Sequence, residues 1–155
     1  MESEQQDKLL GQISPLDDNE WLLRLHFSPE HIQDGEFVPT AISLSDLKER
    51  GYSLDREAFV ERHLIVDRAE AQSMRLPEKR KESYLSRFEC GPVRCLKHEG
   101  ETAFEVKESP RHDNPAHAHI LSAQRLGDGA LRKLRNYLLP YLKPPVLLDD
   151  YMQQP

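Results

Sequence analysis

The sequence predicts a single α+β domain, built from an antiparallel or mixed sheet of short strands with an amphipathic helix near the C-terminus. Apolar and polar residues alternate over several short runs, which is the pattern of half-buried strands. One later run repeats its leucines at helical spacing, which favours a helix with one apolar face. The order in which these runs follow one another favours the α+β class.

Length and charge indicate the number of domains and disfavour one class of partner. The 155 residues fit one domain, and 21 basic against 27 acidic side chains leave a formal charge of -6, which argues against a dedicated polyanion binder. We expect residues 1–18 to be a flexible N-terminal arm, residues 19–143 to form the domain and residues 144–155 to form a peripheral tail.

Cysteine usage and hydropathy indicate a cytoplasmic protein. Cys90 and Cys95 are too few for a disulfide scaffold and lack C-x-x-C spacing, so we expect both to be reduced thiols. The acidic N-terminus does not resemble a secretory signal, and no apolar run is long enough to cross a bilayer.

The first half of the chain predicts two strands and two short helices. Residues 21–27 predict a half-buried strand, because Trp21, Leu23, Leu25 and Phe27 share one face and Leu22, Arg24 and His26 share the other. Residues 36–42 predict a second strand that Pro39 restricts to an edge or a break. Ser43 starts a capping pattern for a short helix that Gly51 would end. A further helix is expected over residues 56–63, followed by a short buried strand at 64–66.

The second half predicts two more helices, a hairpin and a strand. The composition of residues 78–88 favours a helix, and the runs 93–98 and 102–106 favour a hairpin around Gly100. Residues 117–122 predict a strand. The C-terminal amphipathic helix follows Gly127 and should end near Leu139, because Pro140 cannot continue it; its expected core-facing residues are Leu131, Leu134, Leu138 and Tyr141.

The candidate chemistry lies in residues 111–121. His117 and His119 are two positions apart on a predicted strand, so both rings leave the same face and could bind one metal ion or one phosphoryl group. His112 and Asp113 precede them, and Asn114 with Pro115 can turn the loop back toward the strand. We therefore name His117, His119, His112 and Asp113 as candidate catalytic residues, with Asn114 as a candidate substrate-binding residue.

An ordinary structural role is the favoured alternative for this loop. His117 would then bond to backbone, Asn114 would support a turn and His119 would face water. The pattern has neither the third alternating histidine of a nucleotide-hydrolysing histidine-triad motif nor an H-E-x-x-H sequence. A divalent metal held by His117 and His119 is therefore an alternative that we do not favour, and no cofactor is identified.

Arg24 is the other candidate binding residue. It shares a predicted strand face with His26, and it could bind an anion beside His117 if its strand neighbours residues 117–122. Simple exposure of Arg24 is the stronger alternative. The basic residues 79–81 are interrupted by acidic neighbours, so we interpret them as a solvated surface and do not expect a nucleic-acid partner.

The layout resembles that of small bacterial proteins of unassigned function that carry an Asn-Pro-Ala-His-Ala segment. Residues 114–118, the leucine-rich run around Arg24 and residues 38–42 carry this resemblance. It implies a bacterial-type cytosolic protein and no particular activity.

Two hypotheses for the function follow. The favoured one is a non-catalytic accessory or protein-interaction protein that binds a protein partner through a sheet edge, a tail or the terminal helix. The alternative is a small enzyme or ligand-binding domain whose histidine site acts on a phosphorylated or nucleotide-like substrate. The sequence contains no P-loop, dinucleotide-binding or nucleophile-elbow motif that would select an enzyme class.

Overall fold

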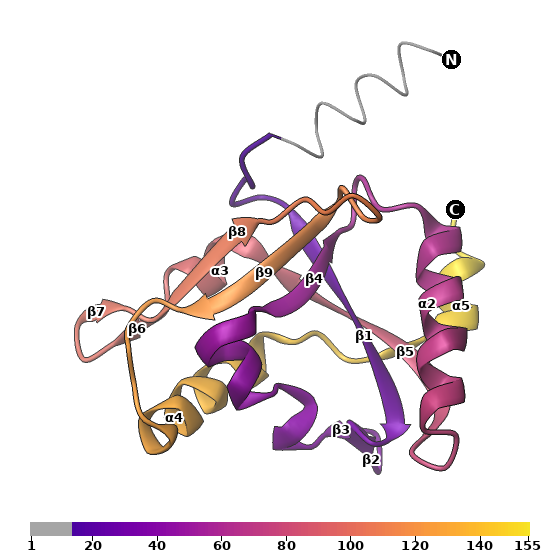
Figure 1. Ribbon diagram of the computed structural model, residues 1–155, viewed down its shortest axis with the longest axis horizontal. Coiled ribbons are helices and arrows are strands. Elements are labelled where there is room, and N and C mark those ends of the chain that lie inside the picture. Colours follow the sequence, from indigo (N-terminus) through magenta and orange to yellow (C-terminus); the bar gives the residue numbers. More distant parts are fainter. Residues whose placement is uncertain (1–13) are drawn as a thin grey trace.

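A six-stranded antiparallel sheet forms the centre of the protein. The computed structural model describes residues 14–155, and the strand order in the sheet is β10-β5-β1-β4-β9-β8 (Figure 1). The strands are β1 (Trp21–Pro29), β4 (Tyr52–Arg56), β5 (Arg80–Glu89), β8 (Phe104–Glu108), β9 (His117–Ser122) and β10 (Val146–Leu147). The predicted α+β class, with one antiparallel sheet and a C-terminal amphipathic helix, is confirmed.

Helices and two small hairpins complete the fold. The helices are α2 (Arg62–Arg75), α3 (Cys90–Arg94), α4 (Asp128–Leu138) and α5 (Leu148–Met152), with shorter helical turns η1 (Pro39–Ala41), η2 (Asp46–Arg50) and η3 (Leu139–Tyr141). One hairpin pairs β2 (Ile32–Gln33) with β3 (Glu36–Phe37), and the other pairs β6 (Lys97–His98) with β7 (Glu101–Thr102). Both turns place two successive residues at positive φ, as tight two-residue hairpin loops require; they are Asp34 and Gly35, and Glu99 and Gly100.

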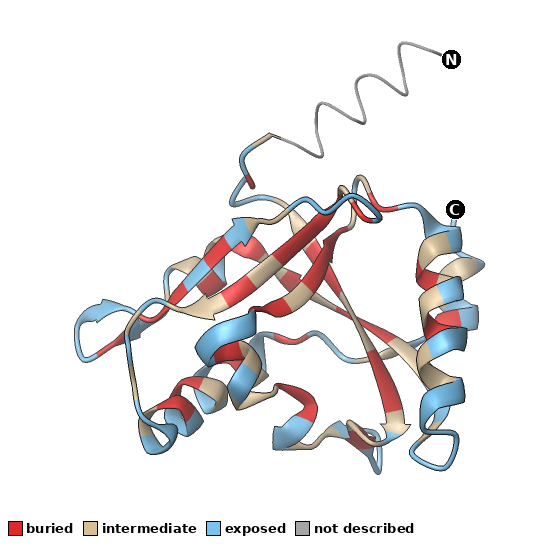
Figure 2. Ribbon diagram, viewed as in Figure 1, coloured by how far each residue is buried: buried red, intermediate tan, exposed pale blue. Residues whose placement is uncertain are grey.

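The two faces of the sheet support two separate apolar clusters. The face that carries Leu22 packs with η2 and α4 in the larger cluster, which includes Tyr52, Phe88 and Ile120. The opposite face carries Leu23 and packs under α2 and α5 in the smaller cluster. Because both faces are covered, β1 is not half-buried as predicted: its neighbouring residues Leu22 and Leu23 lie on opposite faces and are both buried. The edge strand β8, by contrast, alternates buried and exposed residues (Figure 2).

Three predicted elements are confirmed. The strands at 21–27 and 117–122 correspond to β1 and β9. The C-terminal helix is α4, whose leucines 131, 134 and 138 are all buried, and it gives way to η3 at Leu139, next to Pro140. Tyr141, by contrast, lies outside α4 and is exposed.

The predicted helix at residues 78–88 is wrong, because this segment is the strand β5. It pairs with β1 along its whole length, from Trp21 opposite Glu89 to Pro29 opposite Arg80. Its charged and serine-rich composition is compatible with a helix, but pairing with a distant strand overrides local propensity. Phe88 and Leu85 are buried on opposite faces, as the strand period of two requires.

The predictions for residues 56–66 are also wrong. Arg56 ends the strand β4, and Leu64–Val66 lies inside α2, where Ile65 and Ala69 are buried four positions apart. A short apolar run does not distinguish a strand from a buried helix turn. The helix expected after Ser43 exists as the π-helical turn η2, and Gly51 ends it with φ of 86°.

Two further predictions need correction. Residues 36–42 form only the short strand β3 before Pro39 starts η1, since a proline removes a backbone donor from a strand. In the predicted hairpin, residues 90–94 are the helix α3, which contains the first two residues of the expected run 93–98, and pairing is limited to β6 and β7. Residues 104–108 form β8, which pairs with β9 instead.

Both ends of the described chain contact the sheet. In the segment expected as a peripheral tail, β10 pairs with β5 and Leu148 is buried in the smaller cluster. Residues 1–13 of the expected N-terminal arm lie outside the described residues. Its last part, residues 14–18, contains the buried Leu16, whose N–H donates to Glu108 at 2.9 Å.

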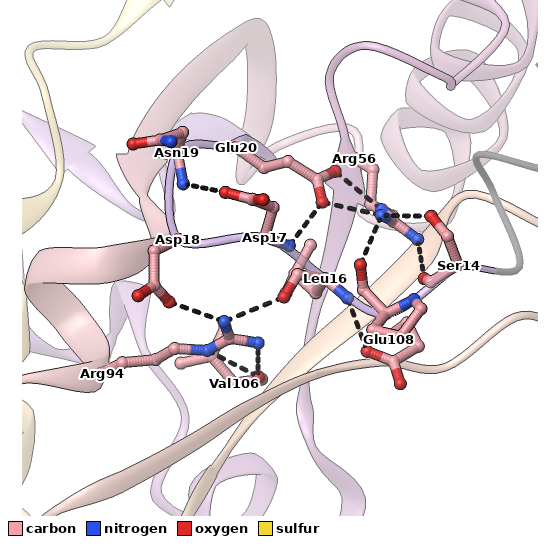
Figure 3. A network of polar contacts seen from close by, with 11 residues as sticks. Ser14, Leu16, Asp17, Asp18, Asn19, Glu20, Arg56, Arg94, Val106 and Glu108 are labelled. Carbon is pink, nitrogen blue, oxygen red and sulfur yellow. Dashed lines mark hydrogen bonds and ion pairs between the residues drawn. The ribbon is translucent and has the colours of Figure 1, made fainter.

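Arg56 joins the N-terminal segment to the end of β4. Its guanidinium, 1% exposed, donates to both carboxylate oxygens of Glu20 at 2.8 and 2.7 Å and to the Ser14 carbonyl at 2.8 Å (Figure 3). It also lies over the Phe59 ring, 5.0 Å from the ring centroid. These partners offset the large free-energy cost of removing the guanidinium charge from water.

Arg94 makes a second connection between the same segment and β8. It donates to the Asp18 carboxylate at 2.7 Å, to the Leu16 carbonyl at 2.9 Å and to the Val106 carbonyl on β8 at 2.8 Å (Figure 3). Residues 14–18 therefore cross one end of the sheet and are bonded to strands on both sides of β9.

We predict that Arg56→Ala lowers the free energy of unfolding by about 3 kcal/mol, because it removes the guanidinium that donates to Glu20 and to the backbone carbonyls of residues 14 and 15. Urea denaturation of wild type and variant measures the difference. The control is Lys107→Ala, which removes an exposed ion pair at 3.7 Å and should change stability by less than about 0.5 kcal/mol. Equal effects of both substitutions would contradict this role for Arg56.

Candidate functional site

His117 and His119 leave the same face of β9, as predicted. Their ring centroids are 6.5 Å apart with an interplanar angle of 83°. His117 is buried, and its Nδ1 donates to the Ser109 carbonyl at 3.0 Å, so Nε2 is the acceptor in the neutral ring. Within residues 14–155 this Nε2 has no hydrogen-bond partner.

Burial disfavours the charged form of both rings. It lowers the pKa of His117 below its ordinary value, and the Arg111 charge lowers it further. The pKa of His119 is lowered by the same two causes. Close packing limits the position of the His119 ring as well, since a Cβ at Gly51 would lie 3.0 Å from it. Both histidines are therefore better suited to accept hydrogen bonds than to carry charge.

Asn114 lies close to His117, but His112 and Asp113 do not join them in a buried site. His112 and Asp113 are exposed, at the tip of a turn closed by the backbone bonds between Arg111 and Asn114. Asn114 is buried, and its Nδ2 donates to Asp55 at 2.7 Å. Of the predicted site residues in this loop and strand, Asn114 and His117 are thus buried, and His112 and Asp113 are exposed to solvent. His119 is partly buried.

Asp55 is the residue that the sequence did not reveal. It lies opposite His117 in the register of β4 and β9, and its carboxylate accepts from Asn114 and from Arg68 on α2 at 2.9 Å. Asp55 therefore connects the histidine loop to the helix that covers this face. No local pattern in the sequence distinguishes it, because its partners come from positions 13 and 59 residues away.

Arg24 lies on the opposite face of the sheet from His117. Arg24 and Leu22 share one face of β1, and Leu22 lies opposite Arg56 on β4. His117 lies opposite Asp55, the residue before Arg56, and neighbouring residues of a strand face opposite sides of the sheet. The Arg24 guanidinium donates to the Ser53 carbonyl at 2.9 Å and lies over the Tyr52 ring, 4.3 Å from its centroid. The strand β4 also separates β1 from β9. The structure does not bring Arg24 and the histidines together.

His26 belongs to a buried polar network on the face of Arg24. Tyr52 donates its hydroxyl to the Ala41 carbonyl at 3.2 Å, so the His26 Nε2–H donates to the Tyr52 oxygen at 2.9 Å. The His26 Nδ1 lies 3.2 Å from the Ser86 hydroxyl. Burial, and then the charge of Arg24, lowers the pKa of His26 well below its ordinary value. This network attaches η1 to the sheet.

A groove of about 590 Å³ lies elsewhere, between α2, the first part of β5 and the C-terminal segment. Figure 1 shows α2 and α5, two of the elements that border it, side by side. Two large apolar side chains on its walls are unusually accessible: Met74 is 81% exposed and Leu147 is 38% exposed. No local sequence pattern predicts this groove, because its walls come from three separate segments. Its lining residues are Val66, Ala69, Glu70, Ser73, Met74, Lys81, Glu82, Ser83, Leu147, Leu148 and Asp149.

The histidines predict a loss of stability at acid pH. A histidine whose pKa is lower in the folded state than in the unfolded state does not reduce the free energy of unfolding above about pH 6.5. Below that pH the free energy of unfolding falls, because the unfolded chain binds the proton first. His26 and His117 have such a lowered pKa, and that of His31 is lowered to about 4, mainly by burial. Each can reduce the free energy of unfolding by up to about 1.4 kcal/mol per pH unit below that point.

Urea denaturation between pH 7 and pH 5 measures this dependence. In His26→Gln, whose amide can replace both ring hydrogen bonds, the slope should be shallower than in wild type by up to about 1.4 kcal/mol per pH unit. The matched control His63→Gln changes an exposed side chain on α2 and should keep the wild-type slope. An unchanged slope in His26→Gln would show that His26 does not contribute.

Comparison of the chain with protein-family models, curated proteins and solved structures finds no match. Among residues 14–155, no three His, Cys, Asp or Glu side chains are grouped closely enough to hold a metal ion. None of the helices in the described part of the chain has the length and apolar character needed to cross a bilayer. Two candidate regions for function remain, the Asp55–Asn114–His117 cluster and the groove beside α2.

Proposed function

We propose that this protein is a non-catalytic accessory protein of a bacterial-type cytosol that binds a protein partner through the groove beside α2. The single observation that carries the proposal is the exposure of Met74 and Leu147 on the walls of one groove. Isolated exposed apolar residues are common on protein surfaces, but two that line the same hollow provide a continuous contact area. Full burial of an exposed side chain of this size yields roughly 1.5–3 kcal/mol. Met74, which is 81% exposed, can gain most of this free energy, and Leu147, which is 38% exposed, gains a smaller part.

The chemistry of the groove favours a polypeptide as the occupant. Methionine is flexible and polarisable, so Met74 can adapt to side chains of different shape. The lining contains three carboxylates, of Glu70, Glu82 and Asp149, and one lysine, which makes the groove unfavourable for nucleic acid. Apolar contact area bordered by charge is typical of protein-binding surfaces.

A ligand site at His117 is the second candidate. The observation that favours it is the pair of buried acceptors, His117 Nε2 and Asn114 Oδ1, which have no hydrogen-bond partner within residues 14–155. Such atoms are costly unless a donor or a cation reaches them. A phosphorylated or nucleotide-like substrate would, however, have to enter a region where His117 is 3% and Asn114 is 8% exposed. The groove needs no such opening.

Site-specific photo-crosslinking separates the two candidates. A photoreactive phenylalanine derivative placed at position 74 should crosslink a partner protein in cells, and the same derivative at His112, beside the histidine loop, should not. The crosslink from position 74 should be lost when Leu147→Glu is added, because a charge at that wall opposes burial. A small-molecule adduct at position 112, with no protein crosslink from position 74, would favour the second candidate. Equal yields of protein crosslinks from both positions would contradict the proposal.

A further inference from the structure

We propose that the partner contributes an extended, basic segment that pairs with the open edge of β5 and lies along the groove. This inference rests on the proposed function and specifies the chemistry of the partner. Three features of the described residues support it: an unpaired strand edge, an excess of carboxylates and an apolar wall.

The edge of β5 is only partly covered. Its inner side pairs with β1, with a register shift that leaves Lys81 without an opposite residue, whereas on its outer side β10 pairs only with Leu85 and Tyr84. Apart from the bonds to β1, the backbone of residues 81–83 has no hydrogen bond within residues 14–155. Lys81, Glu82 and Ser83 also line the groove. The free edge and the groove therefore form one continuous surface. A partner strand bound there would pair with β5 next to β10 and continue the hydrogen-bond ladder that β10 begins.

The opposite edge of the sheet is less suited to such pairing. The carbonyl of Val106 on β8 already accepts from the Arg94 guanidinium, at 3.2 Å from Nε and 2.8 Å from Nη2. The N–H of Leu16 is bonded to the Glu108 side chain, so residues 14–18 pass across the same edge. The backbone of β8 is therefore partly bonded on its outer side, whereas that of residues 81–83, beyond the short outer strand β10, is not bonded there in the described part of the chain.

The charges around the groove select a basic occupant. Glu70 on α2, Glu82 on β5 and Asp149 on α5 surround it, and Lys81 is the single basic lining residue. An acidic segment would meet like charges, whereas lysine or arginine side chains would be attracted. Leu85 faces α2, so Glu82, three positions earlier on β5, faces the other side of the sheet. Because successive side chains of a strand point to opposite sides, we expect apolar residues facing Met74 on α2 to alternate with basic residues on the side of Glu82.

Selection from a displayed library of random eight-residue peptides tests this inference with the full chain. We expect enriched peptides in which Lys or Arg alternates with apolar residues, bound with a Kd measurable by fluorescence anisotropy. Glu70→Lys with Glu82→Lys should weaken binding by about tenfold or more, and added salt should weaken it in the wild type. N-methylation of alternate peptide amides, which keeps the side chains but removes strand hydrogen bonds, should have a comparable effect.

The control is Glu101→Lys, an exposed charge reversal on β7 that should leave the Kd unchanged. Wild-type urea midpoints in all variants would show that they remain folded. Enrichment of acidic or neutral peptides, no enrichment, or a Kd unaffected by charge reversal or by N-methylation would overturn the inference. The proposed function would survive those results if crosslinking from position 74 still succeeds, and it fails separately if that crosslink is absent.

Discussion

The fold depends on a charged side chain that is removed almost completely from water. Leaving the Arg56 guanidinium inside the protein without partners would cost several kcal/mol, and the partners that prevent this come from residues 14–20. Those residues precede β1, and Arg56 is the last residue of β4, the strand next to it. The same contacts therefore fix the entry into the central strand and the point where the chain leaves β4 toward α2.

Other polar groups within the sheet are used in a similar way. His26 connects β1 through Tyr52 to η1, and Asp55 connects β4 to the loop before β9 and to α2. The His26 ring and the Asp55 carboxylate have hydrogen-bond partners within the fold, so their chemistry is largely committed to structure. The exposed apolar side chains beside α2 have no such partner, and this contrast directs the functional interpretation to the groove.

The sequence was informative wherever the signal was local. The alternation in β1 and the leucine spacing in α4 follow directly from the periods of strands and helices, and both elements formed as predicted. β5 was missed because its charged residues are compatible with a helix, and only its pairing with β1 makes it a strand. Propensity cannot anticipate a contact between segments about 60 residues apart in the chain.

The same limit applies to the sites. That His117 and His119 share a face could be predicted from their spacing, and they do. That Arg24 lies on the other face could not, because it depends on the register across β4. Asp55 and the groove escaped prediction for one reason: their neighbours come from distant segments that only the folded chain brings together.

Titration of the isotope-labelled protein with a basic peptide selected for binding, followed by amide NMR spectra, tests the central claim most directly. That claim is that binding takes place in the groove, whereas the polar cluster around His117 serves the fold. The account predicts chemical-shift changes concentrated in residues 66–74, 81–83 and 147–149, with residues 111–119 unchanged. Changes centred on residues 111–119, with the groove unaffected, would contradict it.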